Sequence, residues 1–243
     1  MSQSYLHTQS DAYGDIAVLR EDDYRILSFG VGDEQSRQLT AKPHQLQHAY
    51  TQAMLLPLLW LAPKRVLILG LGAGSLLSAL HHAVPGVRIT AVELRQAVID
   101  IAIRYFRLPQ SKKIELHCAE AGAFMTTGLA KKQDLILTDL YLDHGMDAVQ
   151  VGAQYIAQCA AQLKAEGWLV LNCWGELNEH TALLEQLEQR FNCVSSCDCG
   201  EGNMVIFASQ QGVSLDRSAL KGRIAQLSTR LDYDLARSFA KWT

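Results

Sequence analysis

Two features early in the sequence have the residue types and spacing of a nucleoside site. Gly70, Gly72 and Gly74 directly follow a short apolar run over residues 65–69. Glycines admit positive φ and let a ligand approach the backbone, where a Cβ would push it away. Glu93 ends a second apolar run and lies about 20 residues beyond the last glycine, the separation at which a carboxylate can accept hydrogen bonds from ribose hydroxyls. The pattern therefore predicts a strand, a ligand-binding turn, a helix and a second strand.

Two further acids occupy equivalent places later in the chain. Glu120 follows a predicted strand over residues 114–118, and Asp139 ends another over residues 134–139. Ligands of a parallel sheet bind at the carboxyl ends of its strands, so these acids and the glycine turn should share one crevice. Structural alternatives remain for each acid, because Asp139 can cap the following turn and Glu120 can be a solvated loop acid. His144, in the loop after Asp139, is either a general base or a surface histidine.

The alternation of strands and helices predicts an α/β fold, a doubly wound and mostly parallel sheet of seven strands. A closing hairpin should add an antiparallel edge. Helices are expected from residue 75, over 95–106, 150–165 and 179–190, and in the charged segment after 215. The seven strands are expected at residues 65–69, 87–92, 114–118, 134–139, 168–172, 193–197 and 204–208.

The region before this domain reads as a small β-sheet. Strands are predicted over residues 15–20, 24–29 and 35–39, and a helix is predicted to open at Pro43. A sheet of this size cannot bury a core alone, so it should pack on the main domain or on a second subunit. We accordingly divide the chain into residues 1–48 and 49–243.

Composition excludes several classes of function. Of the 243 residues, 22 are Lys or Arg and 25 are Asp or Glu, so the net charge of −3 indicates no large positively charged surface for nucleic acid, and only a modest local basic patch remains an alternative. The longest apolar run, over residues 54–62, contains Pro57 and is too short for a membrane span. The first residues do not resemble a secretion signal, so we expect a cytoplasmic protein.

The six cysteines are expected to be reduced rather than bridged. Cys193, Cys197 and Cys199 share one face of a predicted strand. They lack a Cys-x-x-Cys pair and a nearby histidine cluster, so we predict small, half-buried strand residues rather than a metal site.

Taken together, these motifs resemble the spermidine synthase (polyamine aminopropyltransferase) family, which has the Rossmann-like fold of class I S-adenosylmethionine-dependent methyltransferases. The resemblance covers roughly residues 14–210 and includes the N-terminal strands. The matching segments are Gly70–Gly74, Ala91–Leu94, Glu120–Ala121, Asp134–Asp139, Gln35–Ser36 and Tyr50–Met54.

The resemblance implies a role for each of these positions. The glycines at 70, 72 and 74 would approach the methionine portion of S-adenosylmethionine or its decarboxylated form, with Gln35 bordering the same pocket. Glu93 would bind the ribose and Glu120 the adenine amino group. Asp139 would position the attacking amine and help to deprotonate it.

The resemblance also implies a small-molecule acceptor, an amine, and a homodimer formed through the N-terminal strands. Tyr50 would belong to the substrate-binding helix. Tyr141 would either stack on the substrate or pack on its own loop, and Trp174 would either wall the pocket or fill the core.

Three positions depart from the family pattern. Ala73 replaces an acid in the glycine motif, Leu142 replaces a second acid three residues after Asp139, with Asp143 next to it, and Gln52 replaces a glutamate. Diamines need acids at both ends, because an unpaired buried cation is costly. Methyl transfer to a small acceptor is therefore an alternative, as is a nucleoside-binding protein without catalysis.

Overall fold

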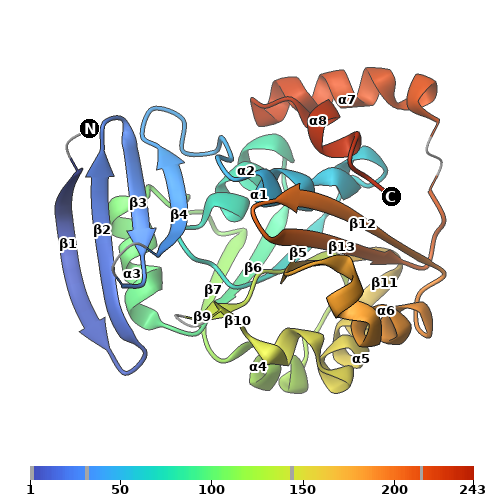
Figure 1. Ribbon diagram of the computed structural model, residues 1–243, viewed down its shortest axis with the longest axis horizontal. Coiled ribbons are helices and arrows are strands. Elements are labelled where there is room, and N and C mark those ends of the chain that lie inside the picture. Colours follow the sequence, from blue (N-terminus) through green and yellow to red (C-terminus); the bar gives the residue numbers. More distant parts are fainter. Residues whose placement is uncertain (1–2, 31–32, 143–144, 214–215) are drawn as a thin grey trace.

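A seven-stranded sheet forms the centre of the protein (Figure 1). The computed structural model describes residues 3–30, 33–142, 145–213 and 216–243. The strand order is β12-β13-β11-β8-β5-β6-β7, and β13 runs antiparallel to both of its neighbours. The predicted fold class is therefore confirmed. The strands are β5 (Arg65–Leu69), β6 (Arg88–Glu93), β7 (Ile114–Cys118), β8 (Gln133–Thr138), β11 (Leu163–Trp174), β12 (Cys193–Gly200) and β13 (Asn203–Ser209).

Helices cover both faces of this sheet (Figure 1). One face carries α1 (Ala49–Met54), η1 (Leu56–Leu59), α2 (Ser75–Ala83), α7 (Arg217–Leu231) and α8 (Leu235–Phe239). The other carries α4 (Ala121–Thr127), η2 (Ala148–Val151), α5 (Ala153–Gln162), η3 (Leu177–His180) and α6 (Thr181–Glu188).

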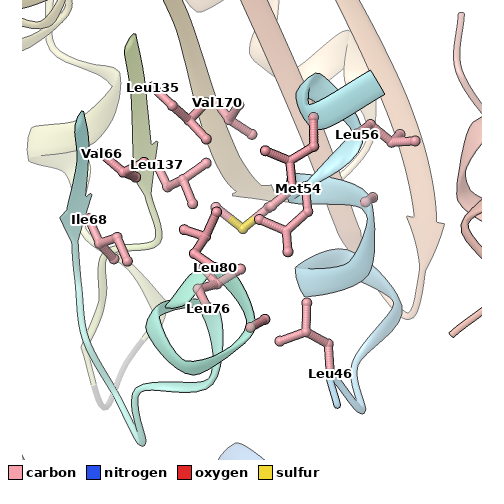
Figure 2. Close-up of a cluster of buried hydrophobic side chains, with 14 of the residues drawn as sticks. Leu46, Met54, Leu56, Val66, Ile68, Leu76, Leu80, Leu135, Leu137 and Val170 are labelled. Carbon is pink, nitrogen blue, oxygen red and sulfur yellow. The ribbon is translucent and has the colours of Figure 1, made fainter. Parts of the chain in front are cut away.

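Residues of one strand alternate between the two layers. Val66 and Ile68 of β5 face the first, whereas Leu67 and Leu69 face the second. Figure 2 shows Met54 among the apolar side chains of the first layer. Both faces of β5 are buried, as its continuous apolar sequence predicts.

The N-terminal residues form a four-stranded antiparallel sheet, with the strands in chain order. Its strands are β1 (Gln3–Asp11), β2 (Gly14–Glu21), β3 (Tyr24–Ser28) and β4 (Glu34–Leu39). The sheet packs on α3 (Gln96–Tyr105) through Ile16, Val18 and Leu27. β1 was not predicted, because it is exposed along most of its length and lacks the apolar alternation of a half-buried strand.

Other departures from the predicted elements are local. The helix expected from Pro43 begins only at Ala49, because the preceding segment turns back and Leu46 forms a β-bridge with Gln38. β11 begins at Leu163, so the helix before it ends at Gln162. The short α4 was not predicted. The loop after Asp139 contains β9 (Tyr141–Leu142) and β10 (Gly145–Met146), and Asp143 and His144 lie outside the described residues.

None of the helices in the described part of the chain combines the length and hydropathy needed to cross a bilayer.

Candidate active site

A cleft of about 860 Å³ lies at the carboxyl ends of β5, β6, β8 and β11. β4 and the turn between β1 and β2 also border it. The structure brings eight of the predicted site residues to this cleft. They are Gln35, Tyr50, Gly70, Gly72, Glu93, Glu120, Asp139 and Tyr141. Gly74 is not among the residues that line it.

The three glycines have different neighbours. Gly70 (φ +91°) packs so closely on the next strand that a Cβ would lie 2.1 Å from the carbonyl oxygen of Asp139. Gly72 (φ +53°) faces Ser36 of β4. Gly74 has φ +79°, which favours glycine, and its Cβ would lie 2.1 Å from Cδ1 of Leu108, so it faces the core rather than the cleft. All three have positive φ, but only the first two border the cleft.

Glu93 holds the glycine turn in place. Its Oε2 accepts hydrogen bonds from the backbone N–H groups of Leu71 (3.0 Å) and Gly72 (3.3 Å), and Oε1 accepts one from Arg95 (3.1 Å). Burial raises the pKa of Glu93, although these backbone donors and the charge of Arg95 oppose the rise. The carboxylate therefore organises the turn and also borders the cleft.

Glu120 caps a helix. Its two carboxylate oxygens accept hydrogen bonds from the backbone N–H groups of Gly122 and Ala123, each at 2.6 Å, at the start of α4. This is the usual arrangement of an acidic N-cap. The residue is exposed and lines the cleft, so the cap fixes the carboxylate at the rim.

Asp139 immediately follows β8 and lines the cleft. Its Oδ1 accepts a hydrogen bond from Nδ2 of Asn172 at 2.8 Å. Burial raises its pKa to about 6, although hydrogen bonding from Asn172 and Tyr50 opposes the rise. This pKa places the carboxyl group where it can exchange a proton near neutral pH.

Two tyrosines lie beside this carboxylate. Burial and the negative charge of Asp139 raise the pKa of both Tyr50 and Tyr141 well above the ordinary value, so both stay protonated. The Tyr141 hydroxyl is buried and lacks a hydrogen-bond partner among the described residues. Both hydroxyls are therefore neutral at this site, and that of Tyr50 donates a hydrogen bond to Asp139.

A buried network fixes the strand ends under Asp139. Gln150 accepts a hydrogen bond from Thr138 (3.0 Å) and donates one to the backbone carbonyl of Asn172 (2.9 Å). Tyr155 donates to the Thr138 hydroxyl at 3.0 Å. Thr138 and Gln150 are completely buried. The ends of β8 and β11 are therefore joined through side chains as well as through the backbone ladder.

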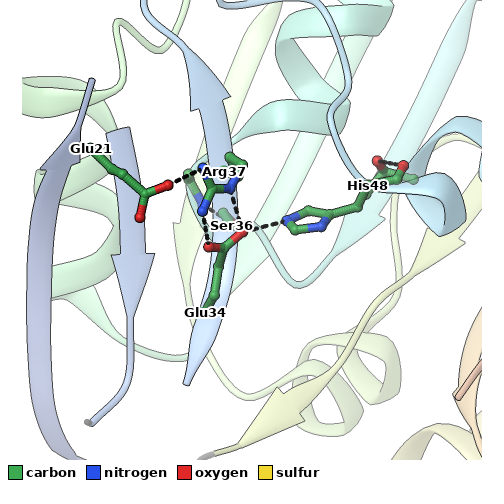
Figure 3. A network of polar contacts seen from close by, with 7 residues as sticks. Glu21, Glu34, Ser36, Arg37 and His48 are labelled. Carbon is green, nitrogen blue, oxygen red and sulfur yellow. Dashed lines mark hydrogen bonds and ion pairs between the residues drawn. The ribbon is translucent and has the colours of Figure 1, made fainter. Parts of the chain in front are cut away.

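Glu34 of the N-terminal sheet and His48 also line the cleft, and both belong to a network of charged side chains. Figure 3 shows Arg37 between Glu21 and Glu34, with His48 on the far side of Glu34. The Arg37–Glu34 ion pair is 2.7 Å long. Ser36 lies on the same strand and accepts a hydrogen bond from the backbone N–H of Ala73 at 3.3 Å. β4 is thereby attached to the glycine turn.

A second connection runs from β6 to the turn between β1 and β2. The Arg95 guanidinium is 95% buried and forms two hydrogen bonds with Asp11, at 2.8 and 3.0 Å. It also donates to the carbonyl of Gly14 and lies over the ring of Phe29. This cation is therefore fully engaged within the chain.

Sequence reasoning missed several residues that line the cleft. They include Asp33, Ser75, Arg95, Asn172 and Asn203. Asn172 is the last residue of the predicted fifth strand, so the argument from strand ends that identified Asp139 applies to it equally. Asp33 immediately precedes β4, and no sequence pattern indicated that it borders the cleft. Trp174 walls the cleft and is 55% exposed.

The three residues that depart from the family pattern lie in different surroundings. Ala73 is completely buried against the N-terminal sheet and α3. Gln52 does not line the cleft, because its side chain donates to the carbonyl of Leu46 at 2.8 Å. Leu142 lies in β9.

The cysteines are free thiols. Cys197 and Cys199 of β12 are buried with their sulfur atoms 3.9 Å apart, in the core beside α8. Within the described ranges, His, Cys, Asp and Glu side chains do not gather into a group of three or more that could hold a metal ion.

Comparison with known proteins identifies the family. The model of the spermine/spermidine synthase domain matches residues 47–206. The chain is 27% identical to the polyamine aminopropyltransferase of Chromobacterium violaceum, over 90% of this chain and 86% of that one. It is 30% identical to the same enzyme of Vibrio vulnificus over 69% of this chain, a match that spans 58% of the relative.

Solved structures show the same fold. A probable spermidine synthase from Corynebacterium glutamicum has a TM-score of 0.75 at 16% identity, with 94% of each chain covered. A spermidine synthase in complex with the transition state analogue AdoDATO also scores 0.75, at 17% identity over 97% of this chain and 85% of that one. Human methyltransferase-like protein 13 in complex with SAH scores 0.59 at 23% identity, over 79% and 89%. With a strand-end cleft and a matching domain model, the chain belongs to the spermine/spermidine synthase family of transferases.

Proposed function

We propose that this protein is an aminopropyltransferase that uses decarboxylated S-adenosylmethionine and an amine acceptor. The observation that carries the proposal is Asp139, a carboxyl group with a pKa of about 6 at the end of a central strand. It faces a cleft that also contains the glycine turn and Glu93. A base that ionises near neutral pH is what an ammonium acceptor requires, since an ammonium has no lone pair.

The charges around the cleft suit a cationic co-substrate. Asp33, Glu93, Glu120 and Asp139 line it, as does Glu34, whose charge is paired with Arg37. Arg95 also lines it, but Asp11 pairs with this cation. A sulfonium and an ammonium therefore meet a negative field there. The carboxylate of intact S-adenosylmethionine would be repelled, which favours the decarboxylated form.

Each residue has a defined task in the reaction. The glycine turn, Gln35 and Glu93 hold the nucleoside and its tail, with Glu120 at the rim. Tyr50 and Tyr141 confine the acceptor beside Asp139, which takes the proton from the ammonium. The freed lone pair then attacks the carbon next to the sulfonium. The sulfonium is a good leaving group, so the protein contributes mainly by positioning the two reactants.

Methyl transfer is the second candidate. Over 62 residues, or 26% of this chain, the sequence is 44% identical to the eEF1A lysine and N-terminal methyltransferase homolog of Drosophila pseudoobscura pseudoobscura. Gln52 stands where the family has a glutamate, and it does not line the cleft. A diamine therefore has one acid fewer to bind its second ammonium group. A methyltransferase needs the same nucleoside pocket without acids for a second ammonium group.

Calorimetric titration with each nucleoside separates these functions. We expect the protein to bind decarboxylated S-adenosylmethionine more tightly than S-adenosylmethionine, which would justify a screen of amine acceptors for transfer. The opposite preference would support methyl transfer. Binding of neither would overturn the nucleoside assignment, and binding without turnover of any acceptor would indicate a non-catalytic homologue.

We further propose a cytoplasmic homodimer formed through the N-terminal sheet. β1 is the edge strand of that sheet, and Tyr5 and Leu6 on it are 65% and 40% exposed. An exposed edge strand with apolar side chains is a template for pairing. Light scattering coupled to gel filtration should give the mass of two chains, and a monomer at micromolar concentration would refute the dimer.

A further inference from the structure

The side-chain amide of Asn172 forms a hydrogen bond through its nitrogen, while its oxygen has no partner among the described residues. It lies on β11, lines the cleft and is 1% exposed. Nδ2 donates to Asp139 at 2.8 Å, while Oδ1 is buried without a partner among the described residues. The orientation of the amide follows from chemistry, because an ionised carboxylate accepts hydrogen bonds only and so requires the NH₂ group to face it.

The free oxygen cannot easily find a partner within the protein. β11 is paired with β8 on one side and with β13 on the other, so its backbone is fixed. The backbone carbonyl of Asn172 also accepts a hydrogen bond from the buried Gln150. A buried acceptor without a donor is unfavourable, and because Asn172 lines the cleft, a ligand bound there can supply the donor.

We propose that Asn172 is the second anchor of the attacking amine, accepting an N–H of the acceptor at Oδ1 while its Nδ2 orients Asp139. This inference rests on the proposed function and specifies how the acceptor is held. The acceptor class is an amine with at least two N–H groups in its ammonium form, one for Asp139 and one for Asn172.

In this arrangement the proton and the electron pairs of the transfer each have a defined destination. The ammonium proton passes to the Asp139 carboxylate, which leaves a neutral amine hydrogen-bonded to Oδ1 of Asn172. The nitrogen lone pair then forms the new N–C bond as the C–S bond breaks, and the bonding pair goes to sulfur to give a neutral thioether. The new amine carries the positive charge, and Asp139 releases its proton to solvent.

An amide differs from a second carboxylate in its effect on Asp139. A neighbouring carboxylate would raise the pKa of Asp139 further by like-charge repulsion, whereas the Nδ2 donor favours its ionised form. Asn172 therefore both holds the nucleophile and keeps its base ionised near neutral pH.

The matched control for this residue is Gln38. Its side chain is also buried, with Nε2 donating to the carbonyl of Phe106 at 2.8 Å and Oε1 without a partner among the described residues. Gln38 does not line the cleft. Gln38→Leu thus reproduces the loss of a half-satisfied buried amide without touching the proposed site.

The test compares Asn172→Leu, Asn172→Ser, Asn172→Asp and Gln38→Leu with the wild type. Two quantities are measured: the affinity of n-butylamine and putrescine for protein saturated with 5′-methylthioadenosine, by calorimetry, and the pKa of Asp139, by carboxyl ¹³C NMR assigned with Asp139→Asn. We expect Asn172→Leu and Asn172→Ser to weaken amine binding about ten-fold. Both should leave nucleoside affinity unchanged and raise the pKa of Asp139.

Asn172→Asp keeps an acceptor for the amine but adds a like charge. It should raise the pKa of Asp139 more than Asn172→Leu does and recover amine binding as the pH rises. Gln38→Leu should change neither quantity.

Amine affinity that is unchanged in folded Asn172→Leu and Asn172→Ser would overturn the role of Asn172 while leaving the proposed function standing. Failure of the wild type to bind the nucleoside would overturn both.

Discussion

Gly70 and Asp139 are in direct backbone contact, so closely that a Cβ on the glycine would lie 2.1 Å from the aspartate carbonyl oxygen. The backbone N–H of Asp139 also donates to the carbonyl of Leu69 at 2.9 Å. The first glycine of the turn therefore sets the position of the candidate base, in addition to leaving room for a ligand.

Gly70→Ala should accordingly damage both stability and activity. The positive φ of Gly70 and the overlap with Asp139 together should lower the free energy of unfolding by about 2–4 kcal/mol. Displacement of Asp139 should reduce the transfer rate beyond the loss of folded protein. Urea unfolding and a rate measured per folded molecule check these two effects.

Gly30→Ala is the control for Gly70→Ala. Gly30 has φ +108° but open space around its Cβ position, so its replacement should show the backbone strain alone. Equal losses of stability in the two variants would contradict the importance of the Gly70–Asp139 contact.

The activity should rise with pH as Asp139 ionises. Because the pKa of Asp139 is raised to about 6, the rate at saturating nucleoside should increase across that pH and level off above it. Asp139→Asn should lose most of the activity, roughly 10²–10⁴-fold for removal of a general base, and should lose this limb of the profile. A retained limb in the variant would assign the titration to another group.

The same pKa shift predicts a change in stability. Folding raises the pKa of Asp139 from 3.8 to about 6, so its favourable contribution is complete below pH 3.8 and is lost as the pH rises through 6. Asp139→Asn should therefore be more stable than the wild type by roughly 2–3 kcal/mol at pH 8. Near pH 4 the two proteins should unfold at the same denaturant concentration. A constant difference across this range would contradict the shift.

Asp33 should contribute to the choice of nucleoside. It lines the cleft, and its Oδ2 accepts a hydrogen bond from Gln35 at 2.8 Å. Removing the charge of Asp33 should reduce the repulsion of the carboxylate of S-adenosylmethionine. Asp33→Asn should therefore lower the ratio of the affinities for the decarboxylated and the intact nucleoside by about three- to ten-fold. Calorimetry with both nucleosides measures this ratio. Asp15→Asn, on the exposed part of β2, is the control and should leave the ratio as it is.

The Arg95–Asp11 pair should hold the N-terminal sheet over the cleft. Asp11→Ala leaves the guanidinium buried without its carboxylate, which should destabilise the protein by about 3 kcal/mol. Although burial raises the pKa of Asp11, hydrogen bonds from Arg95 and Tyr13 lower it more, so the pair should persist until the pH falls below the ordinary range of an aspartate. Hydrogen exchange in β1 and β2 should increase in Asp11→Ala, and unchanged protection would show that the pair does not anchor this sheet.

The sequence alone predicted the central sheet and most of the cleft. The strands β5, β6 and β8 are largely apolar runs that end at a glycine or an acid, so local pattern was enough to place Gly70, Glu93 and Asp139 at one edge. The exposed strand β1 was missed, because its pairing with β2 satisfies the backbone without a buried face of its own.

Only the tertiary structure decided what each of these side chains touches. Gly74 has the positive φ of Gly70, yet its Cβ position faces the side chain of Leu108, more than 30 residues later in the sequence, and not the candidate base. Asn172 and Asp139 are 33 residues apart in sequence and meet because β11 pairs with β8. Local periodicity specifies which face of an element is buried, whereas contacts between strand ends depend on strand order, which is a property of the whole chain.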